Sequence, residues 1–238
     1  MYVIGERING MFKAVAAAIR EQDKKTIQEL ALGQVKAGAN ALDVNVGPTA
    51  EDSAKAMDWL VSAIIEVTDV PLSIDSPKPA VLEVGLSKAK KAILNSTTCE
   101  LEKLNILLPL AKKYNAPIVG LTISEKGVPS TASGRVELAA LLVATAMEHG
   151  IDPEHIFVDP VILPVNVAQT QCGEVLKAIS ECKMITCPSP KTILGLSNVS
   201  QGTKQRPLIN RTYLVMAQAY GLDAVICDPF DTELMNAM

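Results

Sequence analysis

Acidic and amide side chains recur along this chain directly after short apolar runs. Asp75, Asn95 and Asp159 each follow such a run, and Asn198 lies in a stretch of small and polar residues after another. Ionised carboxylates accept hydrogen bonds from N–H groups, and an amide can both donate and accept. The residue types indicate a site for a small molecule that is rich in N–H donors.

Eight apolar runs alternate with amphipathic segments and predict an α/β fold. The predicted strands lie near 2–5, 41–46, 71–75, 92–95, 116–121, 156–159, 191–195 and 223–227. The predicted helices lie near 23–37, 51–67, 78–88, 100–114, 134–149, 170–181 and 207–220, with a short one from about 231. Regular crossovers with no place for the strand order to reverse favour a closed (β/α)8 TIM barrel over an open sheet. We expect a single domain over residues 1–238 with a short or truncated last helix.

This fold would bring the polar residues together, because active sites of such barrels lie at the carboxyl ends of the strands. Glu6, Asp43 and Asp228 also follow apolar runs and belong to the same end. Buried acids are costly unless they accept hydrogen bonds. Reduced pterins carry adjacent ring N–H and amino groups that suit a pair of carboxylates.

Composition excludes several other functions. The 238 residues are 48% hydrophobic and 3% aromatic, which permits a large aliphatic core. A net charge of −4 argues against a nucleic-acid partner. No apolar run reaches the ~18 residues of a membrane span and no signal peptide is recognisable, so a cytoplasmic protein is predicted. Five cysteines without a C-x-x-C pair and only two histidines predict neither disulfides nor a metal site.

Six motifs, taken in order and spacing, resemble the pterin-binding methyltransferases that act on corrinoids, and in particular the methyltetrahydrofolate:corrinoid/iron-sulfur protein methyltransferases. They are Glu6-Arg7-Ile8-Asn9, Asp43-Val44-Asn45, Ser73-Ile74-Asp75-Ser76, Asn95-Ser96, Asp159-Pro160 and Gly195-Leu196-Ser197-Asn198. The resemblance extends over essentially the whole chain.

The resemblance implies roles for individual residues. The pterin would be bound by Asp75, Asn95, Asp159, Asn198, Lys183 and Arg206. The corrinoid would approach Gln201, Gly202 and Asn95, while Glu6 and Asp43 would support the site. Asn198 would be the catalytic residue, because its amide can strengthen a hydrogen bond to the methyl-bearing ring nitrogen as charge changes there.

The resemblance also implies a reaction and a partner. The methyl group of 5-methyltetrahydrofolate would move to Co(I) of a cobalamin-type corrinoid, leaving tetrahydrofolate, in the reductive acetyl-CoA pathway. The Asp-x-His-x-x-Gly pattern of corrinoid-binding modules is absent from the sequence, so a corrinoid iron-sulfur protein would bring the corrinoid. The aliphatic composition and the short last helix predict a homodimer.

Two alternative functions remain open. A dihydropteroate synthase would share the pterin-binding barrel, but its Asp-Pro-Gly turn is replaced here by Asp159-Pro160-Val161 and its Lys-x-His ending is absent. A folate-binding barrel without catalysis is the second alternative. For single residues, structural roles also remain open: strand-end caps for the acids, a turn for Asn198, and solvated surface for Lys183 and Arg206.

Overall fold

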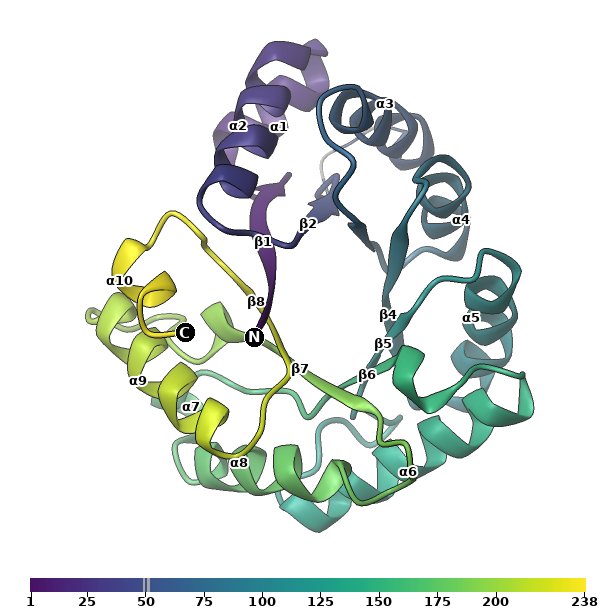
Figure 1. Cartoon of the computed structure of the whole chain (residues 1–238), viewed down its shortest axis with the longest axis vertical. Helices are drawn as coiled ribbons and strands as arrows, with labels where there is room; N and C mark the ends of the chain where they lie inside the picture. The colour runs from purple at the N-terminus through teal and green to yellow at the C-terminus, as the bar shows by residue number, and fades with distance from the viewer. Residues whose placement is uncertain (49, 51) are drawn as a thin grey trace.

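The strands close into a complete parallel barrel in strand order β1 to β8, which confirms the predicted TIM barrel (Figure 1). The computed structural model describes residues 1–48, 50 and 52–238. The strands are β1 (Tyr2–Asn9), β2 (Ala41–Asn45), β3 (Leu72–Asp75), β4 (Ala92–Thr98), β5 (Ile118–Leu121), β6 (Ile156–Asp159), β7 (Lys191–Gly195) and β8 (Ala224–Cys227). Each lies within a few residues of its predicted position.

Helices surround the barrel as an outer ring (Figure 1). They are α1 (Lys13–Glu21), α2 (Lys24–Lys36), α3 (Ser53–Ile65), α4 (Pro79–Lys88), α5 (Leu101–Lys113), α6 (Ala132–Glu148), α7 (Val165–Ala168), α8 (Gln171–Cys182), α9 (Arg206–Ala219) and α10 (Thr232–Met235), with short 3-10 turns at Pro153–His155 and Leu196–Asn198. The sequence did not predict α1 or α7. No helix among the described residues is long and apolar enough to cross a membrane.

Helix starts follow local sequence signals. The sequence offers Thr49 or Asp52 as the cap of α3; Asp52 is the N-cap and accepts a hydrogen bond from the backbone N–H of Lys55, whereas Thr49 lies outside the described residues. Pro79 occupies the first turn of α4, where the missing N–H of proline costs nothing. These signals explain why the predicted starts of α3 and α4 are accurate to one or two residues.

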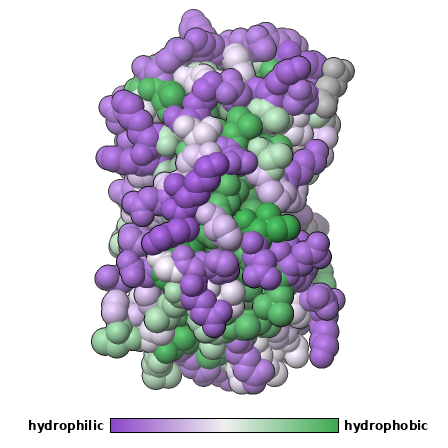
Figure 2. All heavy atoms as spheres, turned by 90° about the vertical axis from the view of Figure 1, so that its right-hand side faces the viewer, coloured by the Kyte–Doolittle hydropathy of each residue, from purple (hydrophilic) through white to green (hydrophobic). Residues whose placement is uncertain are grey.

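The apolar residues form two kinds of core. A small cluster inside the barrel includes Ile4, Ile93, Phe157 and Ile193, and larger clusters fill the space between the strands and the helices. The face of the molecule in Figure 2 is mixed, with hydrophobic patches between hydrophilic side chains. The barrel is therefore a packed scaffold that presents its loops at either end.

Two strands extend beyond their predicted ends toward the same face. β1 continues to Asn9, so Glu6 lies within its strand rather than after it, and β4 continues to Thr98, so Asn95 lies in the middle of its strand rather than at the end. Both strands are irregular here, because the register with their neighbours shifts between Gly5 and Ile8 in β1 and between Asn95 and Thr97 in β4. A register irregularity changes the direction of a side chain, and such features are common near active sites.

Candidate functional site

A hydrogen-bonded network joins the carboxyl ends of β2, β3 and β4. Oδ1 of Asp43 accepts hydrogen bonds from Oγ of Ser73 at 2.7 Å and from Nδ2 of Asn95 at 3.0 Å. Oδ2 of Asp75 accepts one from Nδ2 of Asn45 at 2.7 Å. The structure thus brings together Asp43, Asp75 and Asn95, and their remaining side-chain oxygens make no other hydrogen bond among the described residues.

The pKa values of Asp43 and Asp75 are both raised. Burial, with a contribution from the charge of Asp75, raises the pKa of Asp43 to about 8, although Ser73 and Asn95 oppose the shift. Burial also raises the pKa of Asp75, against the hydrogen bond from Asn45. Two acids held close together in a desolvated site do not both ionise easily. Such a pair is typical of a functional site, because a fold gains no stability from it.

Asp159 lies at the end of β6, and its carboxylate is fixed by backbone groups. Oδ1 accepts a hydrogen bond from the N–H of Val161 at 2.7 Å, and Oδ2 lies 3.4 Å from the N–H of Gly195. Burial raises the pKa of Asp159 to about 6, and the two backbone contacts limit the rise. At neutral pH this group is an ionised acceptor with its second oxygen only weakly engaged.

Asn198 lies on the 3-10 turn that follows β7, and its side chain is exposed. A side-chain carbon at Gly195 would meet Nδ2 of Asn198 at 3.0 Å, so the amide lies directly over that glycine. Its neighbour Ser197 donates a hydrogen bond from Oγ to Oε1 of Glu6 at 2.6 Å. The contact joins β1 to the Asn198 turn, and burial raises the pKa of Glu6 despite it.

Arg206, at the start of α9, lies beside this turn. Its Nη2 donates to the carbonyl oxygen of Ser197 at 3.2 Å and its Nε donates to Oγ of Ser200 at 3.1 Å. The structure therefore places Arg206 at the barrel mouth, where its guanidinium holds the segment that carries Asn198.

Gln201 and Gly202 follow the same turn and are exposed. Gly202 has a φ of +75°, a conformation that glycine adopts without strain. A side-chain carbon there would approach Nδ2 of Asn166 in α7 to 3.1 Å. A side chain at Gly202 would therefore both strain the backbone and crowd Asn166.

Lys183 is predicted as a pterin ligand, which requires it to lie at the barrel mouth, and this placement is wrong. Lys183 follows α8 and therefore precedes β7, which places it at the amino ends of the strands. Its Nζ pairs with both carboxylate oxygens of Asp223 at 2.7 Å, just before β8. The ion pair joins two loops at the end of the barrel opposite Asp75 and Asp159.

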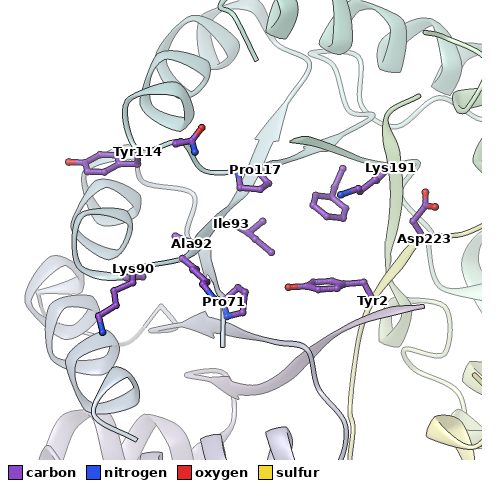
Figure 3. Close-up of a pocket in the computed structure, with 13 residues that line it drawn as sticks. Tyr2, Pro71, Lys90, Ala92, Ile93, Tyr114, Pro117, Lys191 and Asp223 are labelled. Carbon is purple, nitrogen blue, oxygen red and sulfur yellow. The ribbon is translucent and has the colours of Figure 1, made fainter. Parts of the chain in front are cut away.

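A cavity larger than the one beside Asp75 also lies at that opposite end. It measures about 660 Å³ and is lined by Tyr2, Phe157 and Lys191 among others (Figure 3). In Figure 3, Tyr2 and Lys191 lie on one side of the cavity, while Lys90 and Tyr114 lie on the other. A smaller pocket of about 320 Å³ contains Asp75. We assign the site to the carboxyl end because the buried, proton-shifted acids gather there, and cavity size alone carries no chemistry.

Several partners of the site residues were not assigned a role from the sequence. Asn45 and Ser73 hold the two acids, and Ser197 holds Glu6. Asn45 and Ser73 belong to the motifs around Asp43 and Asp75, and alternation along a strand would have pointed them inward. No group of three or more His, Cys, Asp or Glu side chains suited to a metal ion occurs among residues 1–48, 50 and 52–238.

Comparison with known proteins identifies the family. The pterin binding enzyme family matches residues 6–228, so this chain belongs to that family. The matched range contains every predicted site residue and runs from Glu6 to Asp228. The barrel and its acidic mouth are therefore those of a pterin binding enzyme.

Two curated proteins and one solved structure illustrate what this chain is similar to. Methylcorrinoid:tetrahydrofolate methyltransferase of Eubacterium limosum is 31% identical over 241 residues, covering 100% of this chain and 89% of that protein. Methionine synthase of Mycobacterium tuberculosis is 30% identical over 238 residues, covering 94% of this chain and 20% of that protein, so this chain spans about a fifth of its length. The Yersinia pestis DHPS solved with a pterine-sulfa conjugate has a TM-score of 0.73 at 18% identity, covering 99% of this chain and 90% of that one, and shares the fold.

Proposed function

We propose that this protein is a methyltransferase that moves a methyl group between tetrahydrofolate and the cobalt of a corrinoid. The observation that carries the proposal is the set of acceptors on β3, β4 and β6 at one barrel mouth, in a chain that aligns end to end with a methylcorrinoid:tetrahydrofolate methyltransferase. A pterin ring offers N–H donors on one edge, and these acceptors suit that edge.

In this proposal the acidic and amide side chains have different roles. Asp75, Asn95 and Asp159 bind the pterin ring, and Asp43 and Glu6 hold Asn95 and the Asn198 turn in place. Arg206 supports the same turn. Asn198 reaches the methyl-bearing nitrogen, and Gln201 with Gly202 faces the approaching corrinoid.

The methyl transfer balances in either direction. From folate to corrinoid, Co(I) supplies the electron pair of the new cobalt–carbon bond, the nitrogen–carbon bond breaks, and the nitrogen takes up a proton. From methylcorrinoid to folate, the cobalt–carbon bond leaves its pair on cobalt, and the nitrogen loses its proton. Both directions share one transition state, so the hydrogen bond from Asn198 that stabilises it accelerates both.

The direction used in the cell follows from the partner. The sequence resemblance favours transfer from 5-methyltetrahydrofolate to a corrinoid iron-sulfur protein of the acetyl-CoA pathway, whereas the name of the Eubacterium limosum relative places methylcorrinoid first as donor. We propose that a separate corrinoid protein carries the cobalt in either case. We also propose a homodimer formed through α9 and its C-cap, where Val215, Met216 and Tyr220 are exposed.

One assay tests the function and its direction together. Purified protein is mixed with methylcobalamin and tetrahydrofolate, or with Co(I) cobalamin and 5-methyltetrahydrofolate, and the cobalt absorption spectrum is followed. The proposal predicts that, in at least one mixture, the protein converts methyl-Co(III) to Co(I) or Co(I) to methyl-Co(III). Tight tetrahydrofolate binding without any spectral change in either mixture would instead identify a binding barrel that does not catalyse.

A further inference from the structure

Arg135 is a fully buried cation on α6 that has no carboxylate partner within ion-pair distance among the described residues. Its Nε donates to the carbonyl oxygen of Pro160 at 2.8 Å, Nη2 donates to Oε1 of Gln171 at 2.9 Å, and Nη1 donates to the carbonyl oxygen of Thr131 at 3.3 Å. A buried guanidinium is costly, so a fold that retains one uses its hydrogen bonds.

The contact with Pro160 leads directly to Asp159. The carbonyl of Pro160 and the N–H of Val161 belong to one peptide unit, which is planar and rigid. Arg135 holds the carbonyl end of this unit, while the N–H end donates to Oδ1 of Asp159 at 2.7 Å. Rotation of this one peptide would break both hydrogen bonds together.

The peptide needs such a restraint. Val161 has a φ of +59°, which is rare for any residue with a side chain and unfavourable for a β-branched one. Conformations of this kind persist when surrounding contacts enforce them, and they cluster at functional sites. Arg135 supplies a charged donor at the carbonyl, and a cation there also polarises the peptide and strengthens its N–H as a donor.

We infer that Arg135 is a positioning residue that sets the direction of the Asp159 carboxylate through the Pro160–Val161 peptide, and so determines how strongly the site binds the reduced pterin. The inference rests on the proposed function, because it takes Asp159 as a pterin ligand. It adds a residue from α6, outside the barrel strands and outside the six sequence motifs.

Calorimetric titration with tetrahydrofolate alone tests this role. Arg135→Met should weaken binding about tenfold, and Arg135→Lys, which keeps a cationic donor, should recover part of the loss. In an Asp159→Ala background, Arg135→Met should weaken binding less than about twofold, because the side chain that accepts from the Val161 N–H is gone. Val143→Ala, a buried change on the same helix, should lower the melting temperature and leave the affinity unchanged.

Two results would overturn the inference: parent-like affinity in both Arg135 variants, or an equal loss in the parent and Asp159→Ala backgrounds. If Arg135→Met does not fold, the Arg135→Lys measurement in the two backgrounds decides by the same comparison. The titration contains no corrinoid, so it measures the role of Arg135 independently of methyl transfer. A protein that binds tetrahydrofolate but transfers no methyl group would contradict the proposed function and still allow this test.

Discussion

The two ends of the barrel place charged side chains in different surroundings. At the amino end, Lys183 and Asp223 pair at 2.7 Å, and both side chains keep about a third of their surface exposed. At the carboxyl end, Asp43 and Asp159 are buried, and their hydrogen bonds come from hydroxyl, amide and backbone donors. Lys183 and Asp223 thus satisfy each other, whereas Asp43, Asp75 and Asp159 retain acceptor oxygens for a ligand.

The contrast also separates cavity size from chemistry. The larger cavity lies at the amino end between Tyr2, Phe157 and Lys191, and the smaller one contains Asp75. Ligand recognition requires polar groups directed at a shared point, and in the part of the chain that the structure describes, the carboxyl end combines them with raised pKa values of neighbouring acids. Variants at the two ends should therefore differ sharply in their effects.

The largest effect is expected at Asn198. Replacing Asn198 with Ala should slow methyl transfer on the order of a hundredfold, the scale of losing one positioned transition-state hydrogen bond. Tetrahydrofolate affinity should fall much less. Asn198→Asp is the matched variant and should not restore the rate at neutral pH, since an ionised carboxylate has no amide donor. Single-turnover kinetics at parent speed for Asn198→Ala would reduce the residue to a binding contact.

A smaller effect is expected for the pterin-binding acids. Asp75→Ala or Asp159→Ala should each lose a charge-assisted hydrogen bond worth roughly 1.5 to 3 kcal/mol, or about ten- to a hundredfold in tetrahydrofolate affinity. Lys183→Met, at the other end, is the control and should keep the parent affinity. Calorimetry on the three variants checks this, and unchanged affinity in both acid variants would refute the assignment.

Asp43 should make stability depend on pH. Its pKa of about 8 lies above the ordinary value near 3.9, so the folded protein binds more protons than the unfolded chain between these values. The free energy of unfolding should therefore fall as the pH rises from about 4 to 8. Asp43→Asn should remove part of that fall. Between pH 5 and pH 8, the free energy of unfolding of Asp43→Asn should fall by at least about 1.4 kcal/mol less than that of the parent.

Urea unfolding of the parent and Asp43→Asn at both pH values measures this difference. An Asn side chain keeps an oxygen acceptor for Ser73 and Asn95, so the network survives the substitution. Identical pH dependence in the two proteins would show that Asp43 is ionised in the folded state at neutral pH.

The smallest effect is expected in the amino-end cavity. Lys191 stands over the ring of Phe157 at 5.3 Å and points away from the proposed site. Lys191→Ala should change tetrahydrofolate affinity by less than about twofold, as expected for distant sites. A tenfold loss of tetrahydrofolate affinity, measured by the same calorimetry, would show that the two ends are coupled or that the ligand binds at the amino end.

The sequence predicted the barrel well because each strand is a short apolar run and each helix is amphipathic. Lys183 was misplaced because it was assigned a role by family resemblance. It lies in the loop from α8 to β7, and this loop leads to the amino end of the strand. The sequence missed α1, which lies between two elements that were predicted as neighbours.

Arg135 illustrates a second limit. Nothing in the local sequence of α6 distinguishes it from a surface arginine, and its role depends on the carbonyl of Pro160, 25 residues away. The strained conformation of Val161 is equally invisible in a one-dimensional pattern. Periodicity identifies elements and their ends, while contacts between loops require the folded chain.

A crystal structure of the protein with tetrahydrofolate tests the central claim most directly, because it distinguishes the two ends of the barrel in one experiment. We expect the pterin ring at the carboxyl end, with its N–H groups within hydrogen-bond distance of Asp75, Asn95 and Asp159. A pterin ring bound instead in the amino-end cavity, between Tyr2 and Phe157, would contradict the account.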